Sequence, residues 1–524
     1  MTHSSNWNYT TMSEEVNLGN GQVARNMIFS FISFAISLFI SFFFTPYLLG
    51  VVGKEAYSFF PLTNNFISYT SILTTAVGSM AARFIIMEFY GGNMEKAKVY
   101  FNTVFVSYIC LSVLFSLLAF ALVLNLESVL NIPAELVSEV KILFSLTFFC
   151  MIVSLPLGIF SVGLSVKNRN DIASRLSVIQ NMIRVGFILG LFYLFQPTIV
   201  YIGLAGCVSM IIGLCYSIYY KIRFLPEIPI NPRKYFDVKA VWTLVSSGIW
   251  NSFNQLSAIL LNQVDLLICN IFINASATGE LAIAKTCPVM IDSIMNMVAG
   301  AFMSKYNILL AKGKMDALVH EIKKAMKVTS TFIGIPLGML LVFGEEFFSL
   351  WVPTVDAHRI YLISCLTIGP MIIGASIYPI FGTYTITNKL KVPSIVLFGA
   401  GSLNLAVIYI VLKTTDLGMW AIPIVSAIQY SIRHSTFSII YGARSIGQKW
   451  WAFYPVLFRG LMGELIVLMI GFAAKFIHSP NTWLMFIVEV GIVSVLALIA
   501  NTFFSFNKSE RKYIFSIIES KIKR

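Results

Sequence analysis

The stretch that decides the fold is residues 25–50, RNMIFSFISFAISLFISFFFTPYLLG, which carries a single charged side chain at its first position. A helix needs about 20 mostly apolar residues to cross the hydrocarbon core of a membrane, so this stretch predicts a membrane-spanning helix. Four serines recur along it at helical spacing and share one narrow face: Ser30, Ser33, Ser37 and Ser41. The stretch therefore predicts a helix that is apolar over most of its surface and polar along one stripe.

Similar apolar stretches recur along nearly the whole chain. Of its 524 residues 57% are hydrophobic and 12% are charged, and the mean hydropathy is +0.80, which excludes the packing of an ordinary soluble protein. We expect an all-α polytopic membrane protein with about fourteen transmembrane helices. The expected spans are 25–50, 57–86, 99–124, 138–164, 176–196, 199–220, 241–272, 279–303, 327–348, 359–386, 392–412, 418–440, 454–476 and 482–505.

The sequence repeats itself at an offset of 221 residues. Residues 92–96, GNMEK, match residues 313–317, GKMDA, and each segment follows the second helix of a predicted half. Adding 221 to the four serine positions of the first span gives Asn251, Asn254, Ala258 and Asn262, and Asp265 continues this second stripe. On the second spans Asn64, Ser71 and Thr75 correspond to Lys285, Asp292 and Asn296. The repeat predicts two pseudo-symmetric six-helix lobes, related by an axis along the membrane normal, with the transport path between them.

These expectations divide the chain into six parts. They are a cytoplasmic N-terminal tail 1–24, an N-lobe 25–220, a cytoplasmic linker 221–240, a C-lobe 241–440, a final pair of helices within 441–506 and a basic cytoplasmic tail 507–524. The first 24 residues lack the basic start and short apolar core of a cleaved signal, so the first span is expected to act as the targeting signal.

The basic residues explain the net charge of +13 without a nucleic-acid partner. With a cytoplasmic N-terminus, the inner loops, the tail and the adjoining helix ends hold about 28 of the 37 Lys and Arg. This positive-inside pattern predicts a multi-pass protein of the bacterial inner (cytoplasmic) membrane with both termini in the cytoplasm. Contact with anionic membrane lipids accounts for the remaining charge.

Ionisable side chains inside the predicted spans are the main candidates for a functional site, because a charge at mid-bilayer costs roughly 2.5–3.5 kcal/mol or more. The buried set is Arg184, Asp265, Lys285, Asp292, Arg433 and Glu464. Two interpretations stay open. The charges either form ion pairs that hold helices together, or they line a hydrated cavity that binds a polar, anionic substrate together with the polar stripes. Asp265, Asp292 and Glu464 could instead take a coupling ion or proton.

No motif for enzymatic chemistry emerges. The seven cysteines lie in apolar segments without metal-ligand spacing, the five histidines are dispersed, and no phosphate-binding loop follows a predicted strand. We expect no cofactor, no metal site and no enzymatic activity. Two helical GxxxG spacings, Gly186 to Gly190 and Gly334 to Gly338, predict close helix packing.

Several segments together resemble a known family. They are residues 45–50, TPYLLG, then Gly53, Glu55 and Tyr57, then Arg83, the loop 92–97, GNMEKA, and later Gln263, Val264, Asp265 and Gly279. They resemble the oligosaccharide and polysaccharide flippases of the Wzx type, O-antigen transporters within the multidrug, oligosaccharidyl-lipid and polysaccharide exporter superfamily that also holds the MATE proteins. One departure is Ser58, where the family usually has glycine. The resemblance covers residues 25–330 by motif and the remainder by helix count.

The resemblance implies a function. Such proteins move undecaprenyl-diphosphate-linked oligosaccharides across the membrane by alternating access, for surface polysaccharides such as lipopolysaccharide. It also implies a polysaccharide polymerase and glycosyltransferases as partners. Under this hypothesis Arg184, Lys285 and Arg433 attract the diphosphate.

Three alternatives remain. A lipid II flippase also has fourteen helices, a multidrug or metabolite exporter of the same superfamily typically has twelve, and a membrane glycosyltransferase or polymerase would normally carry a large external loop.

Overall fold

The computed structural model describes residues 12–508, 510 and 511, so residues 1–11 of the predicted tail 1–24 and most of the predicted tail 507–524 lie outside the described residues. The described residues form helices joined by short loops, and they contain no strand. The chain divides into two compact units, unit 1 (Met1–Gln255) and unit 2 (Leu256–Arg524), and the boundary falls inside one helix, α10. The lobe boundaries expected from the sequence stay a prediction.

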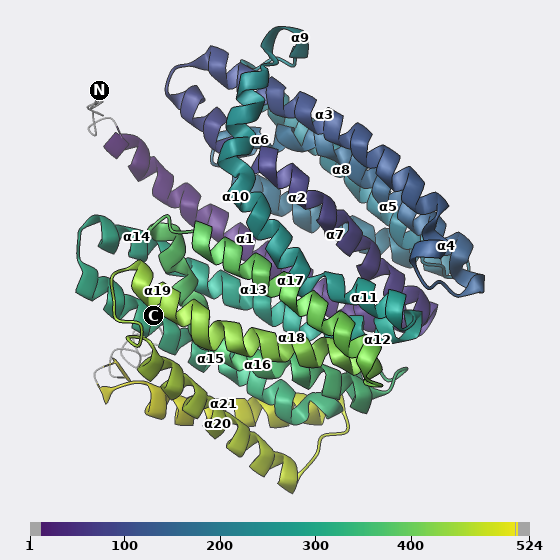
Figure 1. Ribbon diagram of the computed structural model, residues 1–524, viewed down its shortest axis with the longest axis vertical. Helices are drawn as coiled ribbons and strands as arrows, with labels where there is room; N and C mark the ends of the chain where they lie inside the picture. Colours follow the sequence, from purple (N-terminus) through teal and green to yellow (C-terminus); the bar gives the residue numbers. More distant parts are fainter. Residues whose placement is uncertain (1–11, 509, 512–524) are drawn as a thin grey trace. The chain divides into compact units, whose positions relative to one another are not determined.

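Unit 1 is built from six long helices with short connecting ones (Figure 1). Its elements are α1 (Met12–Val52), α2 (Lys54–Tyr90), α3 (Met94–Leu124), α4 (Leu126–Val129), η1 (Ala134–Leu136), α5 (Val137–Leu157), η2 (Gly158–Ser161), α6 (Val162–Val166), α7 (Asn170–Leu194), α8 (Val200–Phe224), α9 (Pro232–Tyr235) and the first part of α10 (Val238–Asn262). Within this unit α1 packs on α7, and α5 packs on both α3 and α8.

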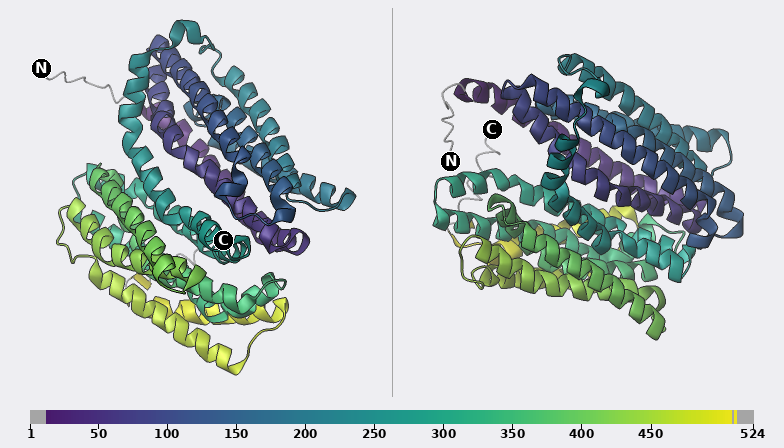
Figure 2. Two further views of the ribbon diagram at one scale, coloured as in Figure 1. Left: turned by 45° about the vertical axis from the view of Figure 1, so that its right-hand side comes forward. Right: turned by 45° about the horizontal axis from the view of Figure 1, so that its top comes forward.

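Unit 2 continues from α10 and ends with two helices that follow the repeat. Its elements are α11 (Val264–Phe272), α12 (Ala275–Ala284), α13 (Thr286–Ala301), α14 (Met303–Ala311), α15 (Met315–Trp351), α16 (Ala357–Ile386), α17 (Lys391–Thr414), η3 (Gly418–Trp420), α18 (Ala421–Arg433), the π-helix η4 (His434–Ser438), α19 (Ile439–Ser445), α20 (Tyr454–Ile477) and α21 (Trp483–Ser505). In Figure 2 the yellow-green α20 and yellow α21 lie alongside the green helices of this unit, where both contact α15.

The chain is an all-α polytopic membrane protein, as predicted. Within the described residues twelve helices are long and apolar enough to cross a membrane, and α10 with α11, which meet at a bend of 42°, add a thirteenth if they form one span. The expected span 418–440 falls in η3, α18, the π-helix η4 and α19, and none of these four is long enough to cross alone. The described residues therefore contain twelve or thirteen candidate spans, whereas about fourteen were expected.

Helix α15 forms the centre of unit 2. Two thirds of its most apolar stretch, 67%, is buried inside the protein, whereas only 11% is buried for α1. A methyl group built on Gly334 would lie 2.2 Å from Glu464 Oε2 of α20, and one on Gly338 would lie 2.7 Å from Val467. The absence of side chains at these glycines thus lets α20 approach closely, as their spacing predicted. The same spacing at Gly186 and Gly190 also predicted close helix packing. That prediction is wrong, because a methyl group at either position would meet nothing within 4 Å.

Two pairs of turns repeat the same local geometry. Gly92 and Gly313, which the sequence repeat aligned, have φ of 81° and 65°, and the residue after each donates its N–H to a carbonyl five residues earlier. Asn168 and Asn388 have φ of 51° and 53°, and here too the following residue donates its N–H to a carbonyl five residues earlier. These turns end helices with a residue in the left-handed region, where glycine and asparagine are favoured. The second pair lies 220 residues apart and was not recognised in the sequence.

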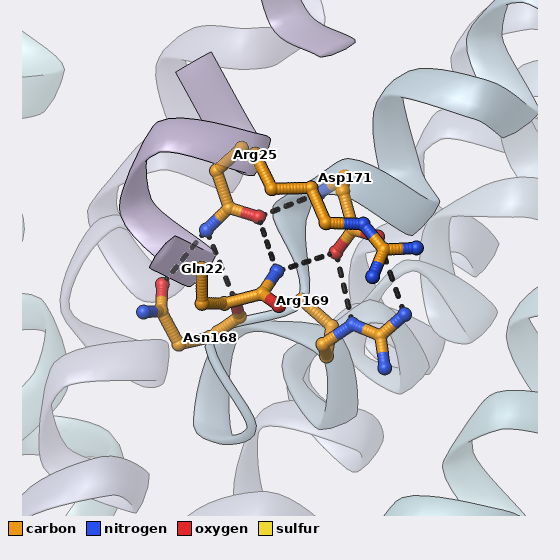
Figure 3. A network of polar contacts seen from close by, with 6 residues as sticks. Gln22, Arg25, Asn168, Arg169 and Asp171 are labelled. Atoms are coloured by element: carbon orange, nitrogen blue, oxygen red, sulfur yellow. Dashed lines mark hydrogen bonds and ion pairs between the residues drawn. The ribbon is translucent and has the colours of Figure 1, made fainter. Parts of the chain in front are cut away.

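A polar network ties the start of α7 to α1 (Figure 3). The carboxylate of Asp171 is fully buried and accepts hydrogen bonds from Arg169, with a nitrogen to oxygen distance of 2.9 Å, and from Gln22 at 2.8 Å. It also pairs with Arg25 at 3.2 Å. The Asn26 amide oxygen accepts the backbone N–H of Asp171 at 2.9 Å, so α1 supplies a cap for α7. Because its guanidinium donates to Asp171, the pKa of Arg169 is raised above its ordinary value.

The segment after α21 is held in the same way. Both carboxylate oxygens of Glu510 lie 2.9 Å from the Lys327 ammonium on α15. Burial raises the pKa of Glu510, but the N–H of Asn507 and the Lys327 ammonium lower it by more, so its pKa lies below the ordinary value. This carboxylate therefore remains charged at neutral pH and anchors the end of the described chain to α15.

We predict that Asp171→Asn lowers the free energy of unfolding by about 1–3 kcal/mol, because the amide cannot accept from both arginines. Thermal unfolding of the purified full-length protein in detergent measures this. Glu227→Gln changes an exposed carboxylate of the same unit and serves as the control. Equal unfolding temperatures for wild type and Asp171→Asn would contradict the role given to the network.

Candidate functional site

The six ionisable residues selected from the sequence fall into groups with different surroundings. Asp265 and Lys285 pair with each other, Asp292 lies in a cluster that includes Arg433, and Glu464 and Arg184 form no ion pair within the described part of the chain. Arg184 belongs to unit 1 and the other five to unit 2.

The Asp265–Lys285 pair lies where two helices break. Helix α10 ends at Asn262, α11 begins at Val264, and Lys285 is the junction residue between α12 and α13. The Lys285 ammonium contacts the Asp265 carboxylate and donates to the backbone carbonyl of Asn262, 2.8 Å away. A cation thus meets the free carbonyl end of α10, and an anion occupies the first turn of α11, where it accepts the N–H of Leu266 at 3.0 Å.

Both members of this pair are largely shielded, with side chains 13% and 16% exposed. Each compensates the charge of the other and the dipole of a broken helix. Of the two interpretations drawn from the sequence, the ion pair is the one that this geometry favours for these residues.

A double-mutant cycle tests the pair. We expect Asp265→Asn or Lys285→Met alone to lower the free energy of unfolding by roughly 3 kcal/mol, because each leaves one buried charge uncompensated. The double variant should lose less than the sum of the two. Thermal unfolding is measured for the purified wild type, the two single variants and the double variant. Strictly additive losses in the free energy of unfolding would show that the two side chains do not stabilise each other.

Asp292, on α13, is held by neutral donors. Its carboxylate accepts hydrogen bonds from the Tyr378 hydroxyl of α16 and from the Asn296 side-chain amide at 3.0 Å. The same amide nitrogen donates to the Asp292 backbone carbonyl at 2.9 Å. Arg433 acts on this carboxylate electrostatically without forming an ion pair within the described residues.

Arg433 ends α18 and is followed directly by the π-helix η4, the only π-helical turn within residues 12–508. Such turns are rare and occur often at functional sites. Their altered hydrogen bonding is compensated here by two hydroxyl donors. Tyr384 donates to the carbonyl of Ser438 and Tyr454 donates to that of Ser435, each over 2.7 Å.

The side chains around η4 present hydrogen-bond donors without acceptors. Arg433 donates to His434 Nε2 at 3.0 Å, so His434 must carry its proton on Nδ1. In the described part of the chain that Nδ1 has no acceptor, and neither has Arg433 Nε or the side-chain nitrogen of Gln429, although all three atoms are buried. Unsatisfied buried groups of this kind are uncommon, and here all three are donors. The arrangement suits a ligand that brings oxygen acceptors.

Glu464 is a buried acid without a cation. Its side chain on α20 is 3% exposed and lies against Gly334 and Gly338 of α15. Its Oε1 atom has no hydrogen-bond partner within the described residues. A charged carboxylate in such surroundings is costly, so this position suits a protonated side chain.

Arg184 lies on α7, over the ring of Phe60, with its guanidinium carbon 5.2 Å from the ring centre. It lines a cavity of 560 Å³ inside unit 1. No residue that lines this cavity is acidic.

The polar stripes of unit 1 serve mainly to connect helices. Ser30 Oγ lies 3.1 Å from Ser174 Oγ of α7, and Ser71 accepts a hydrogen bond from Gln255 of α10 at 2.9 Å. Ser33 is buried, whereas Ser41 and Asn64 are exposed. Serines that bond across helix interfaces are a common means of association in membranes.

The counterpart stripe of α10 is less uniform. Asn251 and Asn254 are half-buried, and Asn262 is exposed and donates to the carbonyl of Ala258 at 3.1 Å. Within unit 2, Asn262 takes no part in the described hydrogen bonds of the cluster around Asp292.

The sequence did not indicate Tyr378 or His434 as members of that cluster. Gln429 and Arg433 lie one helical turn apart, and this spacing does indicate a shared polar face. Nothing in the spacing connects Tyr378 with Asp292, from which it is separated by 86 residues.

Solved transporters share this fold. The lipid II flippase MurJ in its inward closed conformation covers 91% of this chain and 98% of its own with a TM-score of 0.64 at 15% identity. An inward-facing multidrug resistance MATE family transporter of the MOP superfamily covers 81% of this chain and 97% of its own with a TM-score of 0.57 at 13% identity. A MOP superfamily transporter from Pyrococcus furiosus covers 81% of this chain and 95% of its own with a TM-score of 0.58 at 14% identity.

A family match is more specific than the fold. The polysaccharide biosynthesis protein family matches residues 23–303, which is more than half of the chain. The chain belongs to this family, and it is a multi-pass membrane protein. It is also similar to the uncharacterized membrane protein EpsK of Bacillus subtilis (strain 168), with 26% identity over 455 residues, 86% of this chain and 89% of EpsK.

The resemblance to polysaccharide flippases drawn from the sequence is thereby confirmed. Neither match links the chain to O-antigen or lipopolysaccharide in particular.

Proposed function

We propose that the protein translocates an undecaprenyl-diphosphate-linked oligosaccharide across the cytoplasmic membrane by alternating access, for assembly of a surface polysaccharide. The match of residues 23–303 to the polysaccharide biosynthesis protein family carries this proposal. The chemistry of such a substrate fits a transporter with polar groups in its interior, because a sugar-diphosphate head is too polar for hydrocarbon while a prenyl tail is at home in it.

We further propose fourteen spans with both termini in the cytoplasm. Helix α18, the π-helix η4 and α19 follow one another without a gap over Ala421–Ser445, and together they are long enough for one more span. The uneven distribution of Lys and Arg supports the orientation. The lipid II flippase structure covers more of this chain than the drug transporter does, 91% against 81%, which supports helices beyond the twelve typical of drug exporters.

We assign the substrate-contacting role in unit 2 to Arg433 with Gln429 and His434. Their buried donors have no acceptor within the described residues, and phosphate or sugar oxygens would supply acceptors. Lys285 is already engaged by Asp265, so its proposed role is to hold the helix break in shape. Asn251, Asn254, Asn262 and Asn296 remain candidates for contacts with the sugar.

Acidic residues are proposed to couple transport to an ion gradient. Asp292 and Glu464 are the stronger candidates, since neither forms an ion pair within the described residues, and Asp265 is the weaker one because Lys285 compensates it. Polymerase and glycosyltransferase partners would act on the same lipid-linked substrate.

Deleting the gene tests the function. We expect loss of surface polysaccharide with lipid-linked oligosaccharide retained on the inner leaflet, because the carrier cannot cross unaided. Extraction and mass spectrometry of the lipid-linked pool, with complementation by the wild-type gene, measure this. Unchanged polysaccharide with increased drug sensitivity would favour a drug exporter, and arrested cell-wall synthesis would favour a lipid II flippase.

Substitution of Arg433 tests the site. We expect Arg433→Gln to lower polysaccharide export about 10- to 100-fold, because hydrogen bonds to a charged group are worth about 1.5–3 kcal/mol. Arg444→Gln, at an exposed arginine of the following helix α19, is the matched control. Wild-type export by Arg433→Gln, at equal membrane levels of both variants, would remove Arg433 from the proposed substrate contacts.

A further inference from the structure

Unit 1 contains a cavity of its own, with a volume of 560 Å³ that is within the range of small-ligand sites. It is lined by residues of α2, α5, η2, α7 and α8 and is open on one side. Methyl groups built on two of its lining glycines, Gly158 and Gly206, would meet nothing within 4 Å. The cavity is therefore open space beside these backbones, and long side chains do not fill it there.

One charge dominates this cavity. Arg184 is the only charged residue among those that line it, and no carboxylate forms an ion pair with it in the described part of the chain. Its guanidinium lies over the ring of Phe60 and interacts electrostatically with Cys150. A cation inside a membrane-spanning helix is expected to have an anionic partner, and no carboxylate among the described residues pairs with Arg184.

Neutral polar groups surround Arg184, and several of them are already engaged. Gln180 donates to the backbone carbonyl of Ser209 at 3.0 Å, which fixes its side chain between α7 and α8, and Asn181 donates to Ser37. Ser177 and Ser217 also line the cavity, and their hydroxyls bond to no other described group. The cavity thus offers a fixed amide framework, a guanidinium and unengaged hydroxyls.

A second cavity of 360 Å³ adjoins the first. Ser154, Gly158 and Ser161 line both of them. None of the residues that line the second cavity is charged. The combined space is therefore polarised, with the only cation at one end and neutral walls at the other.

We propose that the Arg184 cavity of unit 1 binds a phosphate-type anionic head group, with the Arg184 guanidinium as its cation and Ser177 and Ser217 as hydroxyl donors. An arginine fork matches phosphate oxygens in a bidentate way, and the absence of acidic lining residues leaves its charge available. The phosphate comes either from a polyprenyl diphosphate or from an anionic membrane phospholipid. This site is separate from the Arg433 cluster, and only the first of these two sources rests on the proposed function.

Binding by the full-length protein tests the proposal. The purified protein in phosphatidylcholine nanodiscs is titrated with inorganic pyrophosphate and with a polyprenyl diphosphate, and in separate nanodiscs phosphatidylglycerol is added. Affinity and thermal stabilisation are measured. We expect Arg184→Gln to weaken binding of the recognised probe at least tenfold and Arg184→Lys to weaken it less, because lysine keeps the charge but loses the fork.

Gly206→Phe fills the cavity while Arg184 stays in place, so it tests the site even if Arg184→Gln folds poorly. Gly190→Phe is the matched control, because Gly190 also has open space beside it and does not line the cavity. We expect Gly206→Phe to abolish binding and Gly190→Phe to retain it. A preference for the polyprenyl diphosphate identifies the transported lipid as the source, and equal binding of phosphatidylglycerol identifies the membrane lipid.

Binding that is absent for every probe, or that survives both Arg184→Gln and Gly206→Phe, overturns the proposal. Polysaccharide export is measured separately in cells. Intact export in the deletion strain would contradict the proposed transport function and would leave the cavity site standing if binding is intact. Lost export in that strain together with absent binding would contradict the cavity site alone.

Discussion

The structure depends on one constraint, which is that the hydrocarbon core of a membrane offers no water to a backbone or charged group. Long helices satisfy their own backbones, and the chain consists almost entirely of them. Where a helix breaks, side chains form the hydrogen bonds that its free backbone groups need. Lys285 contacts the carbonyl of Asn262 at the end of α10, and Tyr384 contacts the carbonyl of Ser438 in the π-helix η4. The breaks are therefore the places where polar chemistry gathers inside unit 2.

The same constraint separates structural charges from available ones. Asp265 and Asp171 are surrounded by cations or donors that belong to the protein, so their electrostatic cost is already met. Arg184, Glu464 and the donors beside η4 have no such partner in the described part of the chain. A group that stays uncompensated in a membrane interior is expensive to keep, and function is the usual reason for keeping it.

Much of the fold could be predicted because membrane helices are specified by local composition. The stretch 25–50 alone predicts α1, and the aligned loops at Gly92 and Gly313 adopt the same turn. Partners across helices could not be predicted in the same way. The hydrogen bond from Tyr378 to Asp292 joins residues far apart in sequence, and a π-helical turn leaves no mark in a pattern based on the ordinary helical period. The sequence therefore identified the charged residues of the site but not which of them are paired.

The close contact between α15 and α20 limits how this protein can vary. The carboxyl group of Glu464 occupies the space that a side chain on Gly334 or Gly338 would need, because added methyl groups would lie 2.2 Å and 2.8 Å from its oxygens. A larger residue at either glycine would have to displace the Glu464 carboxyl group. A smaller residue at 464 would relieve the contact at Gly334, whereas Val467, 2.7 Å from a methyl group on Gly338, would still restrict that position. The residue at 464 therefore determines which substitutions Gly334 tolerates, while Gly338 is restricted by two side chains of α20.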